Sequence, residues 1–119
     1  MLFRSAAAAT VTWNGPAVTN AANNWTTGGN WLGGVSPVAA DDVKFFDVGA
    51  IPGTNNVNNT VDVSTNIASL QYGSTNGLHT TFIAAGQTLS ITGTGGLTIG
   101  TPGDVGGSRT NWVDRKSVV

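Results

Sequence analysis

Side chains that could perform acid–base or nucleophilic chemistry are few in this sequence. It contains no Glu, six Asp, one histidine (His79) and no cysteine, so disulfides and thiolate metal sites are excluded. His79 lies between an expected turn and an expected strand, where a surface or strand-edge position is more common than a catalytic one. The sequence has no G-x-S-x-G motif, no H-E-x-x-H motif and no phosphate loop. We therefore predict no catalytic residue, no cofactor and no enzymatic activity.

Two adjacent carboxylates, Asp41 and Asp42, precede a strand-like segment. Calcium is bound by about six to eight oxygens, but the chain has no Asp-x-Asp-x-Asp-Gly loop, and adjacent side chains of an extended segment point to opposite sides. We therefore assign the pair to a turn and to protection of a sheet edge, and predict no metal site. A glycosidase-type pair among the scattered Asp residues stays open as a weaker alternative.

Three of the four tryptophans, Trp13, Trp25 and Trp31, lie close together near the N-terminus among Asn, Thr and Gly. Exposed indole faces stack on sugar rings, so one interpretation is a carbohydrate contact made by these three residues. The other interpretation, which we favour, is a cap in which the indoles cover the end of a β-stack. The Asn residues between them then serve the backbone of the turns.

The stretch 87–101, QTLSITGTGGLTIGT, contains a short internal repeat. The triplet Leu-Ser-Ile at 89–91 returns eight residues later as Leu-Thr-Ile at 97–99. In each copy the apolar pair occupies one strand face, and the spacing leaves room for a Gly-Thr-Gly corner but not for a helix. Such a unit buries its apolar face only when another copy stacks on it, as in a solenoid. As stacked strands, or as a hairpin around 93–95, the two copies should share one core formed by Leu89, Ile91, Leu97 and Ile99.

The rest of the chain also has the composition of an all-β protein. Only 9% of the residues are charged and 17 are Gly, whereas globular domains carry about 25% charged residues. Strands are expected at 10–13, 43–46, 60–64, 67–72 and 80–83, with Val61 and Val63 inward and with Ala68, Leu70 and Tyr72 on one face. Asn76-Gly77 is a signal for a tight hairpin turn.

Charge and hydropathy narrow the possible partners. The formal net charge is −1, which provides no basic surface for nucleic acid or anionic lipid. No apolar run reaches the roughly 20 residues of a transmembrane helix. We therefore predict no nucleic-acid partner and no membrane contact within this chain.

Both ends of the chain are expected to be non-native. Residues 2–5 can be encoded by CTC TTC CGA TCN and residues 114–117 by GAT CGG AAG AGC, which are reverse complements over nearly their whole length. Such a pair is typical of sequencing-library adapters, so 1–5 and 114–119 are interpreted as scars of an internal gene fragment. The four alanines at 6–9 fit the end of a signal peptide. Residues 102–113 are expected to form a loop or a truncated rung.

The order of motifs resembles the start of large bacterial autotransporter-type surface proteins with β-strand repeats. The motifs are W-N-G, N-N-W-T-T-G-G-N-W, P-x-A-A-D-D-V-K-F, T-V-D-V, I-A-S-L-Q-Y and L-S-I-T-G-T-G-G-L-T-I-G, spread over residues 10–101. The resemblance implies a right-handed parallel β-helix and a secreted, outer-membrane or cell-surface passenger with a structural or adhesive role. The chain lacks most of the repeats of that family and its C-terminal membrane barrel.

We therefore expect residues 10–101 to form the N-terminal cap and first rungs of a β-solenoid. Its partners would be further rungs of the same parent chain and host or matrix glycans or proteins. Two alternatives stay open: a carbohydrate-binding antiparallel β-sandwich that uses exposed Trp, and part of a polysaccharide-acting β-helix enzyme.

Overall fold

The computed structural model describes residues 9–16, 21–50, 57–75, 77–99 and 112–115. The elements, in chain order, are β1 (Thr10–Thr12), the 3-10 helices η1 (Ala21–Asn23) and η2 (Gly28–Asn30), β2 (Asp42–Phe45), β3 (Asn59–Val61), β4 (Thr65–Tyr72), β5 (Thr80–Ile83), β6 (Leu89–Ile99) and β7 (Trp112–Arg115). Helical structure in this part of the chain is limited to the two three-residue turns. The predicted all-β class is confirmed.

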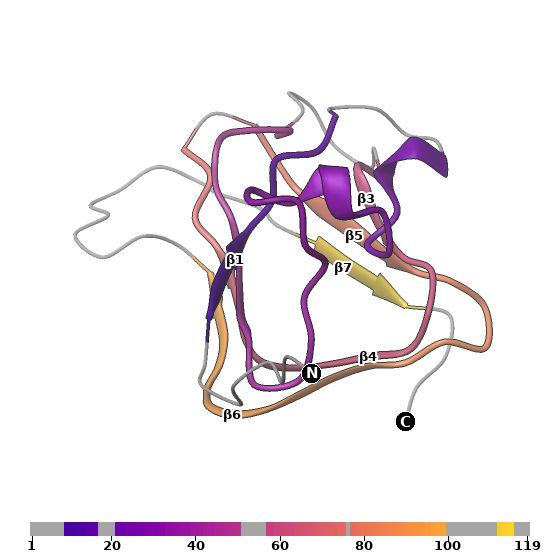
Figure 1. Ribbon diagram of the computed structural model, residues 1–119. Coiled ribbons are helices and arrows are strands. Elements are labelled where there is room, and N and C mark those ends of the chain that lie inside the picture. The colour runs from indigo at the N-terminus through magenta and orange to yellow at the C-terminus, as the bar shows by residue number, and fades with distance from the viewer. Residues whose placement is uncertain (1–8, 17–20, 51–56, 76, 100–111, 116–119) are drawn as a thin grey trace, which may run out of the picture.

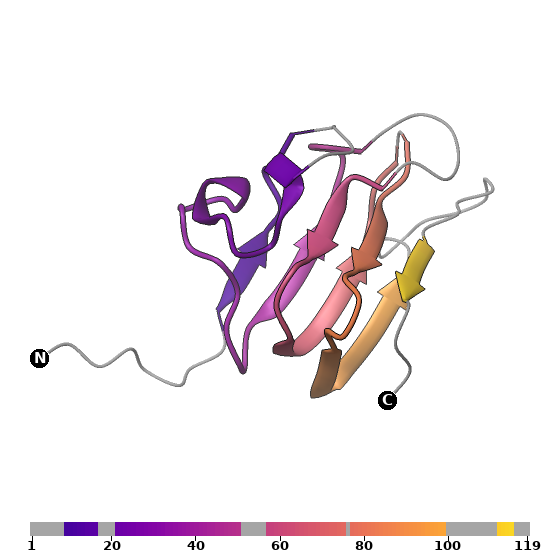
Figure 2. The ribbon, with the colours of Figure 1, turned by 90° about the vertical axis from the view of Figure 1, so that its right-hand side faces the viewer.

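The strands form two sheets, with the orders β1-β2-β4-β6 and β3-β5-β7. Every pairing between these strands is parallel. From β2 onward the chain alternates between the sheets, and from β4 onward each strand pairs with the strand two positions earlier. Figure 1 views the molecule along this stack, and Figure 2 shows the strands side by side.

The parallel pairing contradicts the antiparallel β-sandwich. The hairpin expected at Asn76-Gly77 is also wrong, because β4 and β5 belong to different sheets. Asn76 itself lies outside the described residues, and Gly77 has a φ of 94°. Gly adopts a positive φ in many kinds of turn, not only in hairpins. The turn at Gly77 connects strands of two different sheets.

Polar side chains also join successive layers. Ser69 donates to Asp42 at 2.5 Å across 27 residues of sequence, and Thr88 N–H donates to Ser64 Oγ at 3.0 Å across 24 residues. These spacings are the length of chain that separates one layer from the next.

β6 contains both copies of the short repeat. Its first arm pairs with β4 as Thr65↔Leu89 to Ile67↔Ile91, and its second arm pairs as Ser69↔Gly96 to Tyr72↔Ile99. Between the arms the register shifts, and Figure 1 shows both strands turning a corner there. The two copies are therefore consecutive arms of one strand, and both predicted arrangements, stacked strands and a hairpin, are wrong.

The predicted Gly-Thr-Gly corner is confirmed at residues 93–95. A Cβ at Gly93 would lie 2.5 Å from the carbonyl oxygen of Ala68, which is closer than non-bonded atoms approach. Only Gly fits where β6 passes this close to β4.

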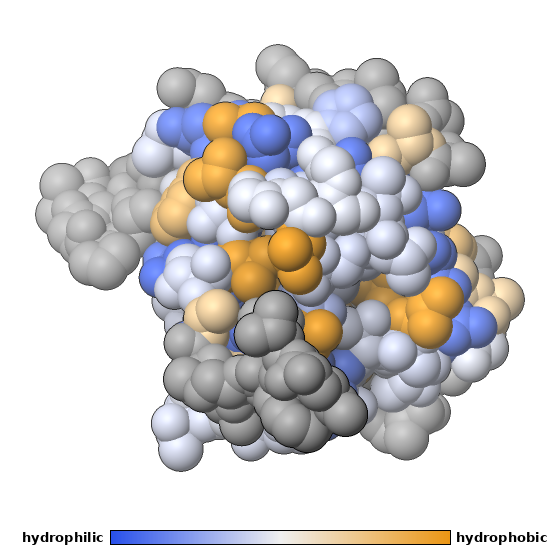
Figure 3. Space-filling model, in the orientation of Figure 1, coloured by the Kyte–Doolittle hydropathy of each residue, from blue (hydrophilic) through white to orange (hydrophobic). Residues whose placement is uncertain are grey.

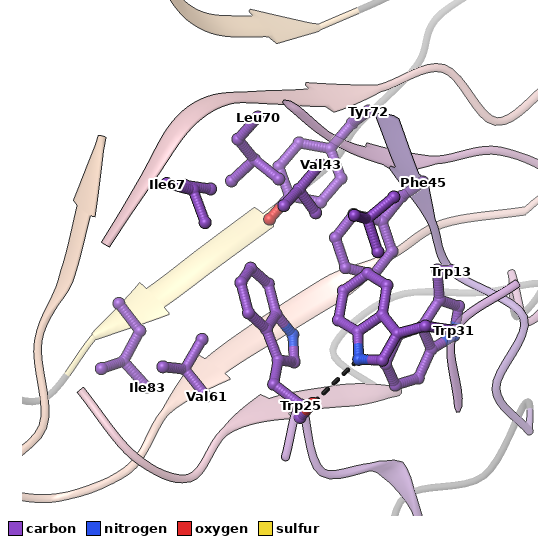
Figure 4. Packing of buried hydrophobic residues seen from close by; sticks show 11 residues of the cluster. Trp13, Trp25, Trp31, Val43, Phe45, Val61, Ile67, Leu70, Tyr72 and Ile83 are labelled. Carbon is purple, nitrogen blue, oxygen red and sulfur yellow. Dashed lines mark hydrogen bonds between the residues drawn. The ribbon is translucent and has the colours of Figure 1, made fainter. Parts of the chain in front are cut away.

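The core lies between the two sheets and is rich in aromatic rings (Figure 4). Phe45 is at its centre, with ring centroids 5.4 Å from Tyr72, 5.5 Å from Trp13 and 5.9 Å from Trp31. Tyr72 Oη and Thr81 Oγ1 lie 2.6 Å apart and link the two sheets through the core. Burial raises the pKa of the Tyr72 hydroxyl, so this group stays protonated.

Two predictions of strand faces are corrected by burial. Val63 is 52% exposed, because β3 ends at Val61 and the chain leaves the sheet there. Ile67 is buried and Ala68 is only partly buried, because the corner in β4 breaks the two-residue alternation.

Candidate functional site

The first candidate region is the closed end, formed by Trp13, Trp25, Trp31 and the segment 30–32 that lies along β1. Trp13 and Trp31 form an isolated antiparallel bridge. Asn14 N–H donates to the Asn30 carbonyl at 2.7 Å, and Leu32 N–H donates to the Thr12 carbonyl at 2.8 Å. The segment thereby bonds to the backbone at the end of β1 and directly beyond it.

The three indoles are buried and each is 1% exposed. Trp13 and Trp31 meet edge to face with centroids 5.0 Å apart, and Trp25 and Trp31 do so at 5.3 Å. A sugar platform needs accessible indole faces. The interpretation of these residues as an exposed carbohydrate contact is therefore wrong for this structure.

Hydrogen bonds hold the indoles in place. Trp31 Nε1 donates to the Trp25 carbonyl at 2.8 Å, which Figure 4 shows as a dashed line. Trp25 Nε1 donates to Asn59 Oδ1 at 2.9 Å. Asn30 Nδ2 donates to the carbonyls of Ala22 and Asn24, at 2.6 Å and 3.0 Å, and so serves the turn backbone as predicted.

Trp13 differs from the other two indoles because its Nε1 has no hydrogen-bond partner. The ring lies between two glycines: a Cβ at Gly49 would be 2.7 Å from Nε1, and a Cβ at Gly15 would overlap the ring. At both glycine positions only a residue without a side chain fits against the ring.

Asn58 and Asn59 form a buried polar pair at the start of β3, just before the strand expected at 60–64. Asn58 Nδ2 donates to the carbonyls of Gly49 and Leu78, at 2.9 Å and 2.8 Å. Asn59 Nδ2 donates to Asn58 Oδ1 at 3.1 Å. The two-residue spacing between Asn59 and Val61, which puts both on the inner face, was the signal that could have predicted this burial.

The acidic residues of the expected turn bond to nearby backbone and hydroxyl groups. Asp41 is buried, and its Oδ2 accepts from Val38 N–H at 2.9 Å. Asp42 accepts from Ser69, and Asp47 accepts from Thr75 Oγ1 at 2.7 Å. The turn role predicted for Asp41 is confirmed. The predicted protection of a sheet edge is wrong, because β2 lies between β1 and β4. Within the described ranges, no three His, Cys, Asp or Glu residues cluster in a way that could hold a metal ion.

His79 is fully buried, which corrects the predicted surface or strand-edge position. Its Nε2 lies 2.5 Å from the Phe46 carbonyl, and its ring is 5.0 Å from the ring of Phe45. Burial lowers the pKa of His79, while the bond to Phe46 and the charge of Asp47 oppose this shift. The histidine is thus a neutral core residue near pH 7.

The second candidate region is the open end, formed by β6 and β7, the last strands of the two sheets. Leu97 and Ile99 lie beside the buried Leu70 and Tyr72, but they are 51% and 54% exposed. Leu89 and Ile91 are partly buried and pack on the core. Within the described residues, the predicted core made of these four residues is therefore covered only on its first arm.

The surface of the closed end has no large apolar patch among the described residues. Figure 3 views the molecule from this side and shows hydrophilic or weakly polar residues, with apolar residues in small separate patches. Such scattered apolar residues are usual on protein surfaces and do not form a docking face.

Comparison with protein-family models, curated proteins and solved structures found no match for this chain. The autotransporter resemblance therefore stays a prediction from sequence motifs. Among the described residues, no helix is long and apolar enough to cross a membrane.

Proposed function

We propose that this chain forms the N-terminal cap and first turns of a right-handed parallel β-helix. The observation that carries the proposal is the order of the strands, in which the chain alternates between two parallel sheets and adds a layer at each pass. A right-handed path is expected, because crossovers between parallel strands are right-handed in nearly all proteins.

The role that fits this architecture is that of a structural or adhesive segment of a secreted or cell-surface bacterial protein, without catalysis. Stacked layers with similar sequence patterns form an extended surface that can bind a partner. Asp41, Asp42 and Asp47 accept hydrogen bonds from neighbouring protein groups. These bonds favour a structural role for the three carboxylates over a catalytic one. The role of a carbohydrate-binding module has less support, because its expected tryptophans are buried.

The purified chain provides a test of the adhesive role. Binding to immobilised matrix proteins and host glycans is measured together with the release of reducing ends from polysaccharides. Saturable binding without release supports the adhesive role, and absence of both supports a purely structural one. Release of reducing ends that persists after repurification would contradict the proposal and favour the polysaccharide-acting enzyme.

The cellular location needs a separate measurement. Antibodies raised against the folded chain should label intact cells of the source bacterium or appear in its culture medium. Labelling confined to permeabilised cells would contradict a secreted or surface role.

A further inference from the structure

We propose that two copies of this chain associate through their open ends as a closed two-fold dimer, with β6 of one copy antiparallel to β6 of the other. The inference rests on the strand stack of the proposed function and adds a partner to it, a second copy. Two observations carry it: the exposed second arm of β6 and the symmetry of its sequence.

Within the described residues, β6 is the last strand of its sheet, and no strand pairs with its outer side. The strand is eleven residues long and contains no charged residue and no proline. Leu97 and Ile99 on its second arm are more than half exposed, although they continue the inner face of Leu70 and Tyr72. An edge of this kind is a ready template for another strand.

The sequence of β6 is self-complementary about Thr94. An antiparallel pair centred on this residue places Leu89 opposite Ile99 of the second copy, Ile91 opposite Leu97, and Ser90 opposite Thr98. Apolar residues meet apolar residues and hydroxyls meet hydroxyls, which is the pattern that stabilises cross-strand pairs. Each partly buried residue of the first arm would cover an exposed residue of the partner's second arm.

The bend of β6 is compatible with this symmetry. The two arms are separated by the corner at residues 92–95, and Thr94 is exposed there. A two-fold axis through the corner exchanges the first arm of one copy with the second arm of the other. The two open cores then close on each other.

The symmetry of the contact limits the assembly to two copies. A two-fold contact uses the same β6 edge on both copies, so no free β6 edge remains for a third copy. Further turns of a longer chain would use the same β6 edge, so they and the dimer exclude each other.

Sedimentation equilibrium of the full chain, with circular dichroism on the same samples, tests the dimer. We expect a reversible monomer–dimer equilibrium with no larger species. Leu97→Lys and Ile99→Lys should each raise the dissociation constant about tenfold or more, because each substitution acts at two symmetric positions. Leu32→Lys, at a residue that is 65% exposed, is the matched control and should leave the constant unchanged.

Cysteine cross-linking tests the register, since the chain has no cysteine of its own. Thr94→Cys should oxidise to a disulfide-linked dimer, because paired Cα atoms of antiparallel strands lie about 4.5–5.5 Å apart, within reach of a disulfide. Ser90→Cys and Thr98→Cys should cross-link efficiently when mixed and poorly when alone.

The outcomes separate this inference from the proposed function. A folded monomer at all concentrations, a dimer insensitive to Leu97→Lys and Ile99→Lys, or growing oligomers would each overturn the two-fold dimer and leave the strand stack in place. A chain without a β-strand spectrum would overturn the stack and the dimer together.

Discussion

The closed and open ends of the strand stack differ in how their apolar interior is covered. Both ends terminate parallel sheets whose apolar interior needs a cover. At the closed end, residues 30–32 bond along β1 and three buried indoles fill the space beside Phe45. At the open end, β6 continues the apolar face, but its second arm is exposed.

The difference shows that a stack needs irregular chain to end it. The cap uses two 3-10 turns, which do not recur among the described residues of the later layers. The β6 layer uses a regular strand whose side chains match the layer below. Regular layers propagate a stack, and atypical terminal units close it.

The largest expected difference between the two ends is the loss of stability when one large side chain is truncated at each end. Trp31→Ala should lower the free energy of unfolding by about 3–5 kcal/mol, because it removes a buried aromatic from the cap. In the monomer, Leu97→Ala should lower it by about 0.5 kcal/mol or less, because that side chain is half exposed there. Urea denaturation followed by circular dichroism measures both. Equal losses at the two ends would show that the open end is packed as tightly as the cap.

A glycine substitution tests whether the corner of β6 is as tightly packed as the structure indicates. Gly93→Ala should cost about 1–3 kcal/mol, because the new methyl group would collide with the Ala68 carbonyl. Gly29→Ala in η2 is the control, since no atom lies within 4 Å of a Cβ built there. Similar melts for the two variants would show that the corner adapts easily.

Lowering the pH should lower the free energy of unfolding through the buried His79. The unfolded chain binds a proton at this residue near the ordinary pKa of about 6.5, whereas the folded chain binds it only at lower pH. The unfolded state therefore carries more protons below about pH 6.5, and stability should fall there by at most about 1.4 kcal/mol per pH unit. Above that pH the contribution is fully present.

Denaturation at pH values on either side of this pKa, compared with His79→Gln, measures the effect of the histidine. The variant removes the titrating group and should have a flatter pH profile in this window. An identical slope in both proteins would mean that other groups cause the acid sensitivity.

The smallest expected effect concerns ligands of the cap. Soluble polysaccharides should leave the tryptophan fluorescence unchanged, because the faces of Trp13, Trp25 and Trp31 are buried. A saturable blue shift that Trp25→Ala abolishes would show that the cap opens to bind sugar. It would also restore the carbohydrate-binding function as a candidate.

Local alternation determined much of this fold from the sequence alone. Val43 and Phe45 are buried and Lys44 lies between them on the outer face, as the strand pattern predicts. The Gly-Thr-Gly corner was predictable because a bend with close backbone contact requires Gly. The tryptophan-rich segment was recognisable as an end of the molecule from its departure from the later strand pattern.

Contacts between layers decided the rest, because a residue's burial depends on neighbours 22–28 positions away in the sequence. The two short repeats look equivalent in sequence, yet Leu89 is partly covered and Leu97 is half exposed, since they occupy different arms of the terminal strand. His79, Asn58 and Asn59 look like loop or surface residues, yet the adjoining layers enclose them, and they bond to backbone carbonyls or to one another. Alternation specifies which side of a strand a residue faces, whereas only the stacking of layers specifies whether anything covers that side.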